Sequence, residues 1–125
     1  MSRSEDAIAF DRHLDATAPD VADVARALHA TVLAEFPDAV ETFDKADGLL
    51  AIGRGRSMRD FQFAIIPHRS WVNLQLADGA ALPDPDSRIE GTGKRVRHVK
   101  VRAVDDARSA WIRRVIGAQL AHGAG

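Results

Sequence analysis

The residues best suited to bind a ligand lie in one short segment, 94–102. Five Lys and Arg side chains and one histidine fall within these nine residues, directly after a turn that contains Gly91 and Gly93. Cationic side chains at this density suit a phosphate or a carboxylate, because charge-assisted hydrogen bonds are stronger than neutral ones. We therefore expect a small anionic ligand here. The residues expected to contact it are Lys94, Arg95, Arg97, His98 and Lys100, with Trp71 and His68 at the rim.

The turn before this segment is not a nucleotide-binding P-loop. A P-loop requires glycine five positions before Gly93, where the chain has Arg88, and serine or threonine after Lys94, where it has Arg95. The turn should also open a helix, whereas the residues after it alternate as a strand does. Nucleotide hydrolysis is therefore disfavoured. The glycines can serve as a flexible turn or as a small anion site of backbone N–H groups.

Strand alternation places two of the arginines on the inner face of the predicted strand. Val99 and Val101 should face the core, and Arg95 and Arg97 then point the same way. Both arginines need acceptors, since an unpaired buried charge is costly. Two hypotheses stay open: an ion-pair network that holds the preceding loop to the sheet, or a site for an acidic ligand. The carboxylates expected to pair with the arginines are Asp84, Asp86 and Glu90.

The sequence predicts no catalytic set and no cofactor. His98 lies among cations that should lower its proton affinity, so it is the candidate general base if the protein is an enzyme. No serine, threonine or carboxylate stands at a spacing that completes a set with it. The five histidines form no His-x-His pair, and cysteine is absent, so neither a metal site nor a disulfide is expected. A non-enzymatic domain is favoured over an enzyme.

Charge is divided unevenly along the chain. Residues 1–50 hold four basic and eleven acidic side chains, for a net charge of −7, and residues 51–125 hold thirteen and seven, for +6. This asymmetry allows an acidic and a basic face, and we expect self-association between them. A dipolar surface without a partner is the alternative. Several acids of the first half could bind a divalent cation weakly. A helix N-terminus explains Asp20 and Asp23 equally well, and solvated turns explain the others. These acids are Asp20, Asp23, Glu35, Asp38, Glu41, Asp44 and Asp47. Nucleic-acid binding is disfavoured, because the overall charge is −1 and few aromatic rings could stack on bases.

The length of 125 residues fits one domain, 1–125, in which residues 1–6 and 121–125 are expected to be flexible. No segment approaches the roughly 20 apolar residues that a membrane span requires, so no membrane association is expected. The N-terminus carries acids and leads into no apolar run, so it does not resemble a signal peptide. These features predict a cytoplasmic protein.

Apolar periodicity predicts three helices. The first covers Ala7, Phe10 and Leu14, and the second begins near 17–20 and ends before Pro37. A final helix is expected after a cap at Asp105 or Asp106, with Trp111, Val115 and Ala118 along one side.

Strand patterns fill the middle of the chain. Residues 49–52 read as a strand, and residues 61–66 and 71–76 form a hairpin in which Phe61, Phe63 and Ile65 should share one face. A long loop and the basic strand follow. The sequence therefore predicts an α+β fold with two layers, an antiparallel sheet of four to five strands and helices on one face.

Four blocks of the sequence carry a likeness to a known family. The blocks are 48–53 (GLLAIG), 67–74 (PHRSWVNL), 79–85 (GAALPDP) and 90–100 (EGTGKRVRHVK). On these blocks the chain resembles the YdhG-like domain of unknown function from Phe43 to about Arg102. The resemblance implies a small two-layer α+β domain and no established activity. Some relatives are described as frataxin-like iron carriers, which implies, as an alternative to anion or protein binding, a cation carrier that uses the acidic first half.

Overall fold

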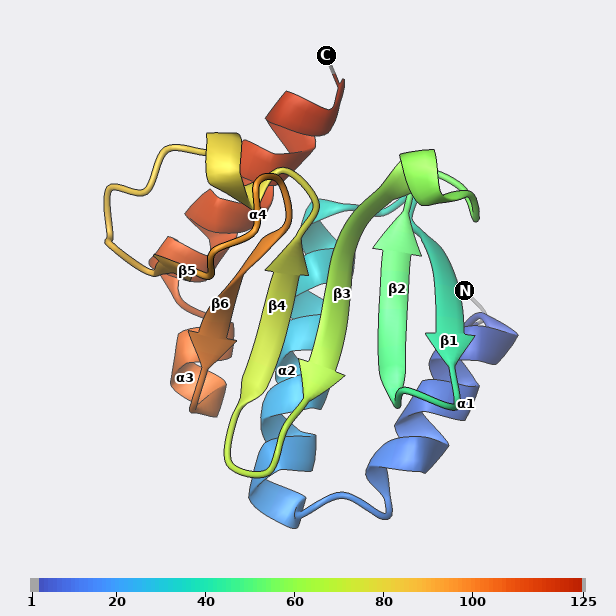
Figure 1. Cartoon of the computed structure of the whole chain (residues 1–125). Helices are drawn as coiled ribbons and strands as arrows, with labels where there is room; N and C mark the ends of the chain where they lie inside the picture. The colour runs from blue at the N-terminus through green and yellow to red at the C-terminus, as the bar shows by residue number, and fades with distance from the viewer. Residues whose placement is uncertain (1–2, 125) are drawn as a thin grey trace.

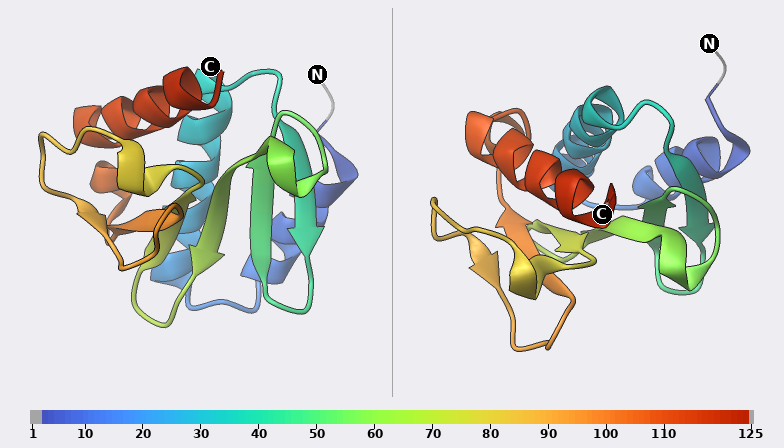
Figure 2. Two further views of the ribbon diagram at one scale, coloured as in Figure 1. Left: turned by 45° about the horizontal axis from the view of Figure 1, so that its top comes forward. Right: turned by 90° about the horizontal axis from the view of Figure 1, so that it is seen from above.

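A computed structural model of the chain describes residues 3–124, which form two layers (Figure 1). Six antiparallel strands make one sheet in the spatial order β1-β2-β3-β4-β6-β5, and the helices lie together on one of its faces (Figure 2). The predicted α+β class and two-layer arrangement are confirmed, with six strands in place of four to five. The strands are β1 (Val40–Asp44), β2 (Leu49–Gly53), β3 (Phe61–Pro67), β4 (Val72–Leu76), β5 (Ile89–Glu90) and β6 (Arg97–Val101).

The first helix, α1 (Glu5–Leu14), begins inside the stretch that was expected to be flexible. The Oγ atom of Ser4 accepts a hydrogen bond from the N–H of Ala7, so the helix has a side-chain N-cap. Ala7, Phe10 and Leu14 are buried, as the periodicity predicted. Residues 1 and 2 lie outside the described part of the chain.

The second helix, α2 (Pro19–Glu35), has the predicted bounds: proline occupies its first position and Pro37 follows its end. Its N-cap residue is Ala18, which makes no side-chain cap, so Thr17 does not cap it. Within residues 3–124, no helix is long and apolar enough to cross a membrane.

The predicted final helix is two helices, α3 (Val104–Ala107) and α4 (Ala110–Ala124). The break falls at Ser109, whose hydroxyl donates to the carbonyl of Asp106 (2.6 Å) and so competes with the helical ladder. Asp105 and Asp106 lie in the first turn of α3 and do not cap it. Helix α4 continues through the residues that were expected to be flexible, as far as Ala124.

A register shift in the β2–β3 pair changes which face its side chains occupy. Ala51 pairs with Ala64 and Ile52 with Phe63, but the next residue, Gly53, pairs with Phe61. The extra residue is a β-bulge. Phe63 is buried beneath the helices, whereas Phe61 lines a hollow on the opposite face. The prediction that Phe61 and Phe63 share a face is therefore wrong.

A buried polar network fixes α4 to the sheet. The Oε1 atom of Gln119 accepts the N–H of Asp78 (2.8 Å), and its Nε2 donates to Gln62 (3.0 Å) and to Oδ2 of Asp78 (2.9 Å). The other carboxylate oxygen of Asp78 accepts from Nε of Arg95 (2.9 Å). Burial acts to raise the pKa of Asp78, but the hydrogen bonds from Gln119 and Arg95 outweigh burial and leave this pKa below its usual range.

Two glycines of α4 offer a matched test of this packing. A Cβ atom at Gly117 would meet nothing within 4 Å, whereas one at Gly123 would lie 2.0 Å from Oε1 of Gln62. We expect Gly117→Ala to raise the free energy of unfolding by about 0.5–1 kcal/mol, because alanine favours helix. Gly123→Ala should lower it by about 1–2 kcal/mol, because Gln62 must leave its partner. Urea denaturation followed by circular dichroism measures both, and equal stabilisation by the two variants would contradict this account of the network.

Candidate functional site

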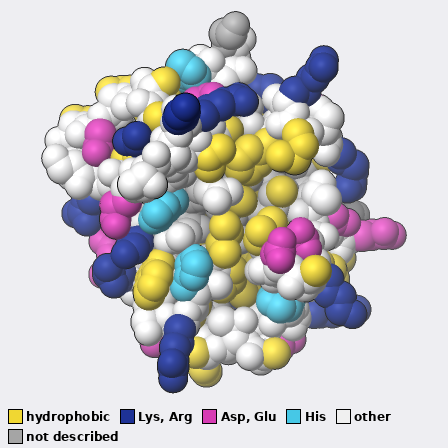
Figure 3. Space-filling model, in the orientation of Figure 1, with side chains coloured by type: hydrophobic (Ala, Val, Ile, Leu, Met, Phe, Trp, Pro, Cys, Tyr) yellow, Lys and Arg dark blue, Asp and Glu magenta, His cyan; other side chains and the backbone are white. Residues whose placement is uncertain are grey.

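Within residues 3–124, no α-helix covers one face of the sheet, and this open face is the most prominent candidate site. The space-filling view from this side shows hydrophobic side chains running across the middle of the face, with Lys and Arg side chains above them (Figure 3). Register explains why this region is hollow. Ala51 of β2 and Ala64 of β3 pair directly, so two small side chains occupy the centre of the row. The residues on either side in the same row, Thr42 and Gln75, are larger.

The hollow is a groove of about 720 Å³. Its volume lies within the range usual for small-molecule sites, which is roughly 300–1,000 Å³. Most of its surface is apolar, and Thr42 and Gln75 flank the two alanines. Its lining includes Val40, Thr42 and Asp44 from β1, Leu49 and Ala51 from β2, Phe61 and Ala64 from β3, Gln75 and Ala77 beyond them, and Arg56, Met58, Arg59, Arg95 and Val96 from loops.

The two ends of the groove carry opposite charge. Arg56, Arg59 and Arg95 line the end beside the β2–β3 connection, and Asp44 lines the end beside the β1–β2 turn. Nη1 of Arg56 lies 3.6 Å from Asp6 and donates to Thr42 (3.2 Å). Arg59 is exposed and forms no salt bridge within residues 3–124. It is therefore the most available of the three arginines that line the groove.

The β2–β3 connection holds Arg59 in place by closing on itself around the 3₁₀ turn η1 (Met58–Asp60). The N–H of Arg54 donates to the carbonyl of Asp60 (2.9 Å), and the Ser57 hydroxyl donates to the carboxylate of Asp60 (2.6 Å). A Cβ atom at Gly53 would lie only 2.3 Å from the same carbonyl, so this close approach requires glycine.

Four of the predicted site residues form a basic-aromatic column beside the groove, defined as His68, Trp71, His98 and Lys100. The His68 and Trp71 rings stack with centroids 5.0 Å apart, and Nζ of Lys100 lies 4.9 Å from the Trp71 ring centroid. Lys100 also pairs with Glu90 at 3.6 Å. His98 lies directly across from Gln75 in the register, so it borders the groove. His68, Trp71 and Lys100 are therefore engaged with one another.

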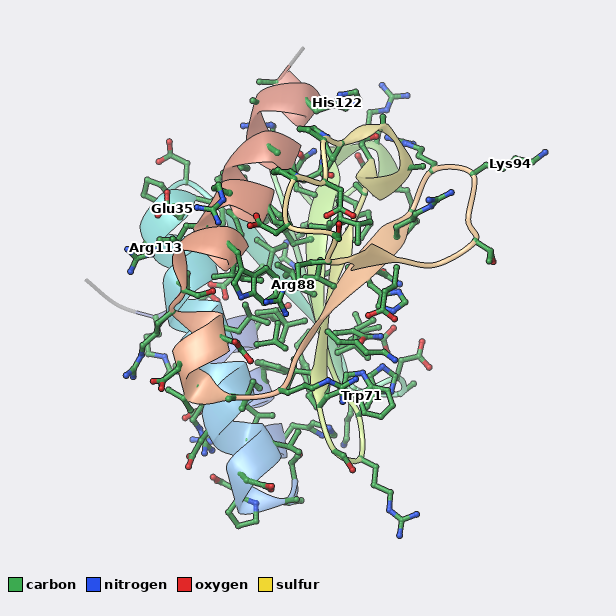
Figure 4. All side chains as sticks on the ribbon, turned by 90° about the vertical axis from the view of Figure 1, so that its left-hand side faces the viewer. Glu35, Trp71, Arg88, Lys94, Arg113 and His122 are labelled. Atoms are coloured by element: carbon green, nitrogen blue, oxygen red, sulfur yellow. The ribbon has the colours of Figure 1, made fainter. Side chains whose placement is uncertain are left out.

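The other three predicted residues lie toward the opposite end of β6. Lys94 is exposed in the loop, and in Figure 4 it lies well apart from Trp71 along the sheet. Nε of Arg97 donates to the carbonyl of Gly93 (3.0 Å), and Nε of Arg95 donates to Asp78. The structure therefore divides the seven predicted residues between two ends of the sheet.

The predicted ion-pair partners of Arg95 and Arg97 were wrong. Arg95 pairs with Asp78, and Arg97 forms no salt bridge within residues 3–124. The three carboxylates that were expected to serve them bind elsewhere in the loop and helix. Asp84 accepts backbone N–H groups of Arg88 and Ile89, Asp86 pairs with Arg114, and Glu90 pairs with Lys100.

Sequence reasoning missed the groove residues Arg56 and Arg59. The available signal was the pair of alanines at the solvent-facing positions of two predicted strands, followed by the cationic loop 53–57 (GRGRS). Recognising a hollow in that pattern requires the pairing register, which a single sequence does not contain.

In the acidic half, Oδ1 of Asp20 lies within hydrogen-bond distance of the N–H of Val21. No cluster of three or more His, Asp or Glu side chains that could hold a metal ion occurs in the described chain.

Comparisons with protein-family models, curated proteins and solved structures found no significant match for this chain. The resemblance to the YdhG-like domain therefore stays a prediction.

A second group of titratable side chains lies between the layers. Nε2 of His29 in α2 and Oε2 of Glu41 in β1 are 2.5 Å apart, and both side chains are nearly buried. The Ser4 hydroxyl donates to the other carboxylate oxygen (3.1 Å). Burial acts to raise the pKa of Glu41, but the hydrogen bonds from His29 and Ser4 outweigh burial and leave this pKa below its usual range. The pair joins both N-terminal helices to the edge strand.

This lowered pKa predicts how stability changes in acid. The unfolded chain binds a proton at Glu41 near its ordinary pKa of about 4.3, before the folded chain does. The free energy of unfolding should therefore fall as the pH drops from about 5 through the folded pKa. In Glu41→Gln we expect the free energy of unfolding to be lower by about 2 kcal/mol at pH 7. Below pH 5 it should decrease less steeply than in the unmodified chain. Urea denaturation at several pH values tests this, with exposed Glu35→Gln as the control. An unchanged acid slope in Glu41→Gln would contradict the assignment.

Proposed function

We propose that this domain binds a small amphipathic anion in the open-face groove. The apolar part of the ligand would lie over Ala51 and Ala64, and its carboxylate or phosphate would reach Arg59 and Arg56. One observation carries the proposal: an apolar hollow of about 720 Å³ ends in arginines, one of which has no salt bridge within the described residues. A hydrophobic floor with a few polar groups at one end is the usual composition of a ligand site.

The proposal keeps the predicted anion but moves its contacts. Arg95 lines the cationic end of the groove, so one of the seven predicted residues takes part directly, and His98 lies opposite Gln75 at its flank. Lys100 and Trp71 contact each other and lie beside the groove, outside its lining. A non-enzymatic binding domain is the function supported best. The two-layer antiparallel architecture also supports assignment to the YdhG-like family, which we retain as part of the proposal.

Nucleic-acid binding is a weaker alternative. Single-strand binding relies on aromatic faces that are free to stack on bases. The Trp71 ring already stacks on His68 and lies beside the cations of Lys100 and Arg102. Among the described residues that line the groove, Phe61 is the one aromatic residue, and it is half-buried. The surface therefore suits a compact ligand better than a strand of bases.

A thermal-shift screen tests the proposal. Medium-chain alkyl carboxylates, aryl carboxylates and the matching alkyl phosphates, each at about 1 mM, should raise the melting temperature, because a ligand that binds only the folded chain stabilises it. Ala51→Leu should abolish the shift by filling the hollow. Arg59→Ala should weaken binding by about tenfold through loss of the charge-assisted contact.

The matched control is Arg113→Ala, which removes an exposed arginine from the helical side of the molecule (Figure 4). It should bind like the unmodified chain. The proposal is wrong if no anion raises the melting temperature, or if Ala51→Leu folds normally and retains the full shift.

A further inference from the structure

We infer that, without ligand, the open face is covered by a second copy of this chain. The two copies would pack sheet against sheet around a two-fold axis, burying both grooves. The inference rests on the same groove as the proposed function and names the protein partner of that site.

The first support is the apolar character of an uncovered surface. Met58 is 88% exposed and Val96 is 38% exposed, and both line the groove together with half-buried Val40, Leu49 and Phe61. Monomeric proteins rarely leave a contiguous apolar patch with a polar rim uncovered, and such patches commonly mark interaction sites. The face therefore has the composition of an interface whose partner is not part of the same chain.

The edges of the sheet are less suited to association. At the β1 edge, the backbone N–H of Phe43 donates to Oδ2 of Asp6 in α1 (2.8 Å), so a donor that could pair with another strand is already used. At the other edge, β5 has only two residues. Native proteins commonly protect edges by covering and by shortening them. Growth of the sheet by strand addition is thus disfavoured. The open face is therefore the surface better suited to association.

The charge pattern fits a second copy in one orientation. In a two-fold dimer, each contact between residue i of one copy and residue j of the other occurs twice. A two-fold axis that lies between the sheets and runs perpendicular to the strands reverses the strand direction. It therefore places the arginine end of one groove opposite the aspartate end of the other. Arg59 of each copy would face Asp44 of its partner, with the apolar floors between them. An axis parallel to the strands would oppose arginine to arginine.

The same two-fold rotation also limits which strands the interface can include. It also brings β6 of one copy toward β6 of the other, and Lys100 and Arg102 lie on this side of the sheet. Stacked twisted sheets cross at about 30°, so strands far from the centre of the contact diverge. The contact would therefore be centred on β1, β2 and β3, and the basic-aromatic column would stay accessible.

The test measures molecular mass without ligand by sedimentation equilibrium, from about 1 µM to about 1 mM protein. The unmodified chain should form dimers within this range. Arg59→Glu and Asp44→Arg should each weaken the dimer by about tenfold or more, because each places like charges opposite one another at two symmetric positions. The double variant carrying both changes should restore the dimer, since the two charges have then exchanged places.

Arg113→Glu, on the helical side, is the control and should dimerise as the unmodified chain does. A monomer at every concentration overturns the inference, and so does a dimer that Arg59→Glu leaves intact or that the folded double variant fails to restore. Circular dichroism confirms that each variant folds. The ligand proposal is judged separately by the Ala51→Leu thermal shift, so a monomer that still binds anions would overturn this inference alone.

Discussion

The bulge between β2 and β3 is the constraint on which the rest of the structure depends. One extra residue in β3 lets Ala51 pair with Ala64 while Gly53 pairs with Phe61. Phe61 then forms a wall of the groove, and the next side chain, Gln62, reaches α4 on the other side of the sheet. A single register shift thus supplies both a wall of the open hollow and an anchor for the C-terminal helix. Only glycine at position 53 permits the close approach of the Asp60 carbonyl that accompanies it.

The buried network around Gln119 extends the influence of this bulge to the groove. Gln119 links Gln62 to Asp78, and Asp78 holds Arg95 at the cationic end. Arg95 is therefore a positioned rim residue whose charge is partly balanced, whereas Arg59 has no such partner among the described residues. The two arginines differ in availability although both line the same hollow. A half-satisfied buried polar network is costly, so each member of this chain of contacts is needed by the others.

The sequence predicted the layers and most elements, because local rules decide them. Helix α2 follows from apolar spacing between Pro19 and Pro37, and the β3–β4 hairpin follows from alternation on both sides of a proline turn. The face of Phe61 could not be predicted, since a bulge reverses alternation and depends on a contact with another strand. The split of the last helix at Ser109 was missed for a similar reason: a side-chain bond competed with the helical pattern.

The candidate site was harder to predict than the fold, because cation density does not reveal which cations are free. Lys100 is held between Glu90 and the Trp71 ring, and Arg95 is held by Asp78. Their charges largely serve to order a loop and a hairpin. Arg59 stands outside the cationic segment, in a short turn with no family motif, yet it combines exposure with an adjoining apolar hollow. Binding capacity depends on that combination, since a desolvated floor strengthens a charge contact at its edge. In the proposed function, the open face would therefore owe its binding to two alanines and one arginine loop more than to the basic strand.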